Sequence, residues 1–151
     1  MPTVVHNTHV SIAEAEIREL LDSIFQAHHD KTAAAIAAPY APNAAIFDLS
    51  PPLAHPGVTL ERMQPWLDSW ETPIDLEFRN LRITVDGEHA YGHGFLRMLG
   101  TKKGADHPVD FWMRATYCFA HGRNGWSIVH EHTSVPFYMD ESLRPAFDLQ
   151  P

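Results

Sequence analysis

The sequence has little of what would cross-link the chain or direct it to a membrane. Its single cysteine, Cys118, excludes an intramolecular disulfide and is typical of a reducing compartment. Residues 1–6 lack the basic start and apolar core of a signal peptide, and the longest apolar run of the helical part, residues 33–38, is too short to span a bilayer. We therefore predict a cytoplasmic protein that does not bind membranes.

Positive charge is also scarce. Eleven Lys and Arg residues stand against nineteen Asp and Glu residues, which gives a formal net charge of −8. Affinity for nucleic acids comes largely from clustered Lys and Arg, and here these residues are scattered along the chain. The balance therefore predicts no nucleic-acid partner.

The order of helical and strand-like patterns indicates an α+β fold. A chain of 151 residues fits a single domain, residues 1–151. Apolar spacing and capping residues predict helices over 11–28, 31–37 and 59–70, and alternation predicts strands over 44–48, 74–85, 90–99, 109–120 and 126–135. Helices followed by a run of hairpins favour helices packed on one face of an antiparallel sheet. Residues 136–151 lack periodicity and are expected to form a C-terminal arm.

Four segments carry a family resemblance: residues 40–44, 47–53, 110–116 and the long, specific motif 124–137. With them the chain resembles, from its first helix to about Phe137, the SnoaL-like group of the nuclear transport factor 2-like superfamily. That superfamily includes ketosteroid isomerase and the association domain of calcium/calmodulin-dependent kinase. The resemblance implies a cone-shaped, cystatin-like fold with one deep pocket, usually dimeric. Isomerases, cyclases, hydrolases and non-catalytic binders share it, so the fold does not fix the activity.

The length of one loop determines which side chains of the last two strands lie on the same face of the sheet. A five-residue loop, His121 to Gly125, would pair Arg114 with His132, whereas a two-residue Asn124–Gly125 turn would mix the two faces. We favour the longer loop. The resemblance then implies two sets of side chains. The inner set, facing the pocket, is Tyr91, His93, Phe95, Phe111, Met113, Ala115, Tyr117, Glu131 and Thr133. The outer set is Trp112, Arg114, Thr116, His130, His132 and Ser134.

Asp48 is the first candidate for chemistry, because the resemblance matches it to the catalytic aspartate of ketosteroid isomerase. A carboxylate in an apolar cavity has its charged form destabilised, which makes it a usable base near neutral pH. The isomerase's second acid is replaced here by Ala115, and its tyrosine position falls near Asp22, so its oxyanion hole is absent. The alternative is that Asp48 caps the proline-rich turn that follows it.

His93, Tyr117 and Glu131 complete a different acid–base set with Asp48. An imidazole and a phenol can donate to a developing oxyanion, and a carboxylate can orient either of them. The alternative is a buried Tyr–Glu or His–Glu pair that only satisfies itself. We expect the walls of the substrate pocket to comprise Phe25, Met63, Trp66, Trp70, Tyr91, Phe95, Phe111, Met113 and Thr133.

His130 and His132 share a face, but a catalytic zinc site needs a third protein ligand, and no motif supplies one. We predict no metal and no cofactor, and expect this face, with Trp112 and Arg114, to form a homodimer. The leading hypothesis is a cofactor-free enzyme that isomerises, cyclises or adds water to a small apolar organic molecule. The alternative is a dimeric ligand-binding or assembly module without turnover.

Overall fold

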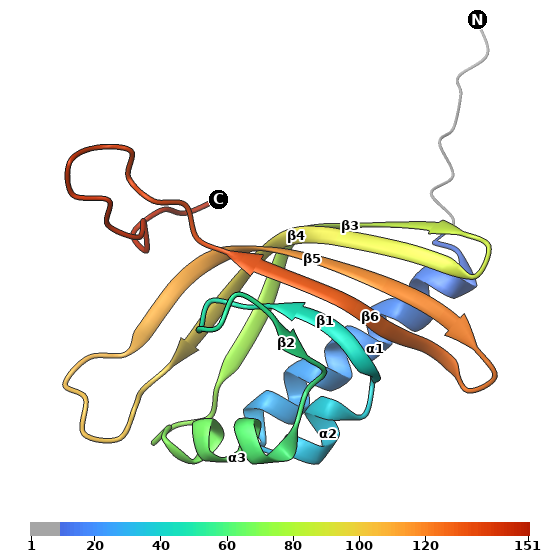
Figure 1. Ribbon diagram of the computed structural model, residues 1–151, viewed down its shortest axis with the longest axis horizontal. Coiled ribbons are helices and arrows are strands. Elements are labelled where there is room, and N and C mark those ends of the chain that lie inside the picture. Colours follow the sequence, from blue (N-terminus) through green and yellow to red (C-terminus); the bar gives the residue numbers. More distant parts are fainter. Residues whose placement is uncertain (1–9) are drawn as a thin grey trace, which may run out of the picture.

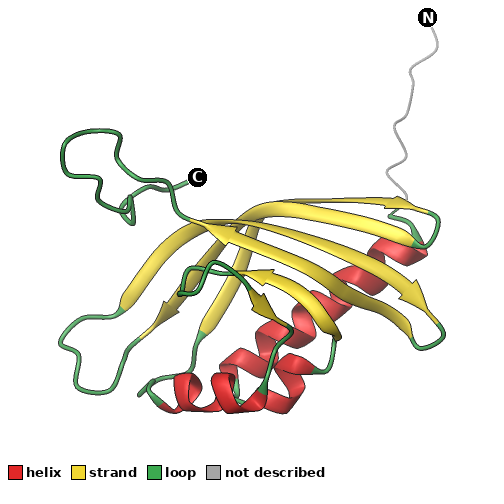
Figure 2. Cartoon of the chain, in the orientation of Figure 1, coloured by secondary structure: helices red, strands yellow, loops and turns green. Residues whose placement is uncertain are grey.

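Three helices lie on one side of a curved six-stranded sheet in the computed structural model, which describes residues 10–151 (Figures 1 and 2). The expectation based on residues 1–6 lies outside this range. The elements are α1 (Ile12–His29), α2 (Ala33–Ala37), β1 (Tyr40–Phe47), β2 (His55–Pro56), α3 (Leu60–Asp68), β3 (Asp75–Asp86), β4 (His89–Gly100), β5 (Val109–Gly122) and β6 (Gly125–Ser134). The predicted α+β architecture is confirmed, and the long helix and the four long strands agree with the expected ranges within two residues.

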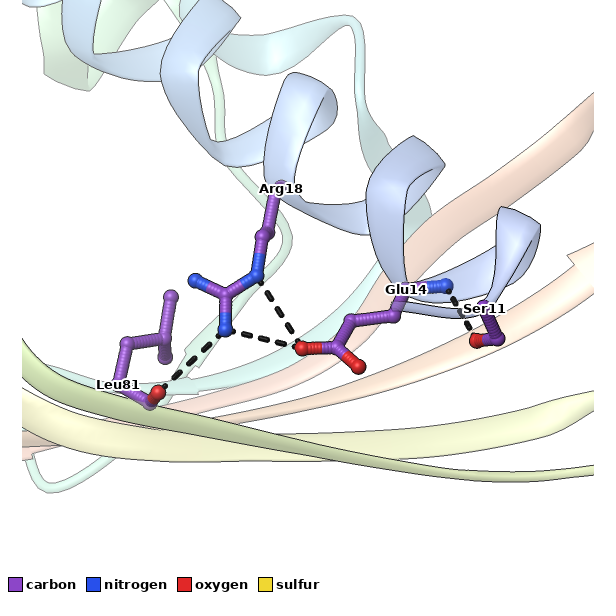
Figure 3. A network of polar contacts seen from close by, with 4 residues as sticks. All are labelled: Ser11, Glu14, Arg18 and Leu81. Atoms are coloured by element: carbon purple, nitrogen blue, oxygen red, sulfur yellow. Dashed lines mark hydrogen bonds and ion pairs between the residues drawn. The ribbon is translucent and has the colours of Figure 1, made fainter. Parts of the chain in front are cut away.

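Helix α1 begins at a side-chain cap and is joined to the sheet by a hydrogen bond from Arg18 (Figure 3). Ser11 Oγ accepts a hydrogen bond from the backbone N–H of Glu14 at 3.1 Å. The Glu14 carboxylate pairs with Arg18 at 2.9 Å, and Arg18 Nη2 reaches the carbonyl of Leu81 in β3 at 3.5 Å. The buried residues of the helix lie on the stripe beside this pair: Ile17, Leu21, Ile24 and Ala27. Within the described residues, no helix is long and apolar enough to cross a membrane.

The sheet is mixed, which corrects the expectation of a purely antiparallel one. Its strand order is β2-β1-β6-β5-β4-β3, and β1 pairs with β6 in parallel, with Ile46 opposite Glu131. Every other pairing is antiparallel. Because β1 lies beside β6, residues 40–48 are brought next to Glu131, which is far away in sequence.

The β5–β6 hairpin has neither of the loops considered from the sequence. Gly122 opposes Gly125, so the turn is Arg123–Asn124, and this pairing alone would mix the faces. A β-bulge corrects it: Phe119 opposes Ile128 and Cys118 opposes His130, so Val129 is the extra residue. Ile128 and Glu131 therefore both face the helices, as expected for Glu131.

Strand β4 has the opposite orientation to the expected one. Gly94 opposes Ala115 and Gly92 opposes Tyr117, so the glycines face the helices and Tyr91, His93 and Phe95 lie exposed on the outer face. A Cβ at Gly94 would lie 3.1 Å from the Arg79 carbonyl oxygen and 3.2 Å from the Phe78 ring. The inner face of β4 is thus closely approached by β3, and a side chain there would require its neighbours to move.

The C-terminal arm folds back on itself beyond the sheet face opposite the helices (Figure 1). The backbone of Phe137 pairs with that of Pro145 in an isolated antiparallel β-bridge, and Ala146 is buried. The Phe147 ring packs edge-on against Phe111 at 4.7 Å between centroids, and Arg79 donates to the carbonyl of Pro151 at 3.3 Å. The arm is therefore anchored to β3 and β5.

Candidate functional site

An apolar cavity of about 290 Å³ lies between the helices and the sheet. Most of its lining is apolar: Ile24, Ile36, Ile46, Leu49, Val58, Met63, Trp66, Leu76, Leu96, Met98 and Met113. A few polar side chains also reach it: His28, Tyr40, Asp48, Ser50, Arg62, Tyr117, Glu131 and Thr133. An apolar pocket with a few convergent polar groups is the usual form of a small-molecule site.

Glu131 is the centre of the first polar group in the cavity. Tyr40 Oη, from the start of β1, donates to Glu131 Oε2 at 2.6 Å. Tyr117 Oη, from the neighbouring strand β5, donates to Glu131 Oε1 at 3.3 Å. Each carboxylate oxygen thus has one phenol donor, and the bond from Tyr117 is the longer and weaker of the two.

Burial sets the protonation of these three groups. Desolvation raises the pKa of Glu131 above the usual carboxyl range, although the two phenol donors and the Arg62 charge work in the other direction. Desolvation, followed by the Glu131 charge, also raises the pKa of Tyr40 and of Tyr117 well above 10.0. Both tyrosines therefore remain proton donors, and Glu131 is a carboxyl group whose affinity for a proton is increased.

Asp48 lies in a second polar group, where β1 ends. Its Oδ1 accepts hydrogen bonds from the backbone N–H of Ser50 at 2.9 Å and from Ser50 Oγ at 2.7 Å. The buried His55 places Nε2 3.5 Å from both Asp48 Oδ1 and Ser50 Oγ. Asp48 thus caps the turn, as one reading of the sequence proposed, and it also lines the cavity, as the other proposed.

The predicted site residues divide into three groups. Those that line the cavity are Asp48, Met63, Trp66, Met113, Tyr117, Glu131 and Thr133. Three others belong to the apolar core instead: Phe25 packs on Phe78, Trp70 is completely enclosed, and Phe111 contacts the arm. The placement of Tyr91, His93 and Phe95 in the pocket is wrong, because the glycines of β4 occupy its inner face.

Several polar groups of the cavity were missed. Tyr40 was missed because strand β1 was expected to start only at residue 44, after Pro42 and Asn43. Ser50 lines the cavity and His55 contacts it; both lie in the proline-rich segment, which has no periodicity to indicate an orientation. Arg62 could have been found, since it lies one helical turn from Trp66, which was expected in the pocket wall. His28 continues the apolar spacing of the first helix but was given no role.

The outer histidines are engaged with backbone and aromatic neighbours. His130 Nδ1 lies 2.6 Å from the carbonyl oxygen of Ala45, and the rings of His130 and His132 both contact Phe47 edge-on. Within residues 10–151, no group of three or more His, Cys, Asp or Glu side chains is arranged to hold a metal ion.

Comparison with known proteins places this geometry in a family. The family model for the SnoaL-like domain matches residues 17–138, and the chain belongs to this family within the nuclear transport factor 2-like superfamily. No curated protein matches the chain. It is similar to a nuclear transport factor 2-like protein of unknown function from Pseudomonas putida KT2440, with 30% identity, a TM-score of 0.80, and coverage of 92% of this chain and 96% of that one.

Two more distant structures share the fold alone. One, from Novosphingobium aromaticivorans, is provisionally named a scytalone dehydratase. It has 10% identity and a TM-score of 0.69, and the match covers 86% of this chain and 88% of that one. The other, from Shewanella frigidimarina, is provisionally named a ketosteroid isomerase. It has 17% identity and a TM-score of 0.63, and the match covers 82% of this chain and 95% of that one.

Proposed function

We propose that the protein is a small-molecule enzyme that moves protons without a cofactor, in an isomerisation, a cyclisation or an addition of water. The observation that carries this proposal is Glu131, a carboxyl group with a raised pKa, facing an apolar cavity between two phenols. A base of raised pKa is suited to taking a proton from carbon or from water at neutral pH.

Each group of the site has a role in this proposal. Glu131 takes the proton, and Tyr40, bonded at 2.6 Å, fixes its orientation. Tyr117, whose bond to Glu131 is 3.3 Å long, turns toward the substrate oxygen and stabilises the charge that develops there. Glu131 then returns this proton to another atom of the substrate, and Asp48, at the end of β1, holds a water molecule. This arrangement shifts the main base from Asp48, favoured by the resemblance, to Glu131.

Similarity of fold supports this class of chemistry. The distant structures provisionally named as a dehydratase and as an isomerase have the same fold, and both names denote proton-transfer reactions on small molecules. The apolar lining predicts a substrate that is mostly hydrocarbon.

A turnover screen tests the proposal. We expect conversion of at least one compound among β,γ-enones, epoxides and β-hydroxy ketones small enough for a cavity of about 290 Å³, followed by mass spectrometry and by proton exchange with deuterated water. The exchange measurement detects reversible proton abstraction even where no net product accumulates. Failure of every class to exchange or react at high enzyme concentration would favour the second candidate.

The second candidate is a binding module without turnover. It is favoured by the hydrogen bonds that the carboxylates already accept within the protein. Both oxygens of Glu131 accept from phenols, and Asp48 Oδ1 accepts two hydrogen bonds from Ser50. In such a module these groups would only satisfy one another and shape the pocket.

We also propose that a second copy of the chain covers the outer face of the sheet. Tyr91, Phe95 and Phe47 are exposed there, whereas Trp112 is already covered by the Arg79 guanidinium, 4.5 Å from its ring. Exposed aromatic residues grouped with polar ones are typical of interfaces.

We expect light scattering to give the mass of a dimer at micromolar concentration, and Phe95→Asp to give a monomer, because a carboxylate cannot be buried there without a partner. Ile12→Asp, which adds the same charge at an exposed position of α1, should remain a dimer. A monomeric wild type would contradict the proposal.

A further inference from the structure

His28 is a polar group of the cavity to which the proposed chemistry gives no role. It lies in the last turn of α1, lines the cavity, and packs edge-on against Trp66, with ring centroids 6.2 Å apart. Its Nδ1 lies 2.8 Å from the carbonyl oxygen of Ile24, one turn earlier in the helix.

That contact determines the tautomer of the ring. A carbonyl oxygen can only accept a hydrogen bond, so Nδ1 must carry a proton. Burial lowers the pKa of His28, although the bond to Ile24 works in the other direction, and the ring is therefore neutral at pH 7. A neutral imidazole with its proton on Nδ1 has a lone pair on Nε2.

Nε2 of His28 has no hydrogen-bond partner among residues 10–151, whereas every carboxylate and phenol of the cavity has one. The nearest aromatic neighbour, Trp66, contacts the ring without supplying a hydrogen bond. Nε2 is not enclosed by protein atoms, because Trp70 Nε1 is the one side-chain nitrogen or oxygen of residues 10–151 that is both fully buried and without a hydrogen-bond partner. It is accessible, so a ligand group that carries a donor can bond to it.

We propose that His28 Nε2 accepts a hydrogen bond from a hydroxyl group of the ligand, so that the pocket selects apolar molecules that carry a hydroxyl group at the end facing α1 and α3. The inference rests on the proposed function only in taking the cavity as the ligand site. It assigns His28 as a residue that determines specificity, and it does not require turnover.

Nitrogen NMR of the histidine rings tests the proposal, with 4-ethylphenol and ethylbenzene as a matched pair of probes. In the free protein we expect the His28 ring to have a protonated Nδ1 and an unprotonated Nε2. Saturation with 4-ethylphenol should shift the Nε2 resonance toward the protonated range, and ethylbenzene should leave it in place. A proton on Nε2 in the free protein, an unmoved resonance, or no binding of 4-ethylphenol would overturn the proposal.

Two variants separate the acceptor from the shape of the ring. His28→Phe removes the acceptor and should raise the Kd of 4-ethylphenol by roughly three- to tenfold relative to that of ethylbenzene, the range expected for one neutral hydrogen bond. His28→Gln can place an amide oxygen near the Nε2 position and should retain the wild-type ratio. Ethylbenzene binding reports whether each variant keeps its pocket. An unchanged ratio in His28→Phe would overturn the proposal.

These outcomes are independent of the turnover screen. A protein that binds 4-ethylphenol through His28 and never exchanges a proton would contradict the proposed enzyme and leave this inference intact. A protein that turns over substrates while the Nε2 resonance stays unmoved would support the proposed enzyme and contradict this inference.

Discussion

Glu131→Gln should lower turnover by about 100- to 10,000-fold, the range that a positioned general base contributes. The amide has nearly the same shape and can still accept from Tyr40, but it cannot take a proton. Steady-state kinetics on the compound found in the screen, with ligand affinity measured separately, would check this result. Affinity should change much less than kcat, because the missing step is proton transfer.

The same substitution should not destabilise the fold near neutral pH. Because the pKa of Glu131 is raised, the folded chain holds this proton more tightly than the unfolded chain does. Stability therefore falls as the pH rises from the ordinary carboxyl pKa through the raised value, and the cost is fully present above it. Glu131→Gln should match the wild type at pH 4 and be at least as stable at pH 8, by melting curves.

Tyr117→Phe tests the second catalytic role, and Asp48→Asn is the control for the choice of base. Tyr117→Phe removes the donor assigned to the developing charge and should lower kcat about 100-fold or more. Asp48→Asn retains an oxygen for the bonds from Ser50 and should cost less activity than Glu131→Gln. If Asp48→Asn were the inactive variant and Glu131→Gln remained active, the assignment of the base to Glu131 would be wrong.

Trp70→Ala should destabilise the protein by about 3–5 kcal/mol, the usual cost of removing a buried large aromatic side chain. Trp70 is 1% exposed and packs edge-on against Trp66 at 5.6 Å between centroids, with Lys102 Nζ 4.6 Å from its ring centroid. For a chain of this size that corresponds to a fall in Tm of roughly 6–20 °C. Thermal melting followed by circular dichroism would measure it.

Trp66→Ala is the comparison, because Trp66 lies one turn earlier and faces the cavity. We expect it to cost less stability than Trp70→Ala and to weaken ethylbenzene binding more. Equal loss of stability in the two variants, with equal loss of binding, would mean that both tryptophans belong to the core and that the wall of the pocket lies elsewhere.

The elements of the fold could be predicted from the sequence because periodicity is a local signal. Ile17, Leu21 and Ile24 repeat at helical spacing and are buried, and Met113, Ala115 and Tyr117 alternate and face the helices. The parallel pairing of β1 with β6 could not be predicted, because it joins Ile46 to Glu131 across 85 residues and no local pattern carries it.

The candidate site could be predicted only in part, for two physical reasons. The inner face of β4 was misassigned because the resemblance that oriented β5 and β6 was extended to β4. In the structure β3 lies so close to this face that a Cβ at Gly94 would be 3.1 Å from the Arg79 carbonyl oxygen. Tyr40 was missed because its role depends on the pairing of β1 with β6. Tyr117 and Glu131 were found because both belong to one hairpin, whose faces the resemblance oriented.

The β-bulge at Val129 determines which side chains of β6 face the pocket. Upstream of it, β6 buries even-numbered positions such as Ile128; downstream, it buries the odd-numbered Glu131 and Thr133. Without the bulge, the same strand would turn the imidazoles of His130 and His132 toward the ligand and the carboxyl of Glu131 toward the surface. The bulge, with no change of residue type, therefore decides whether this strand lines the pocket with a carboxyl group or with two imidazoles.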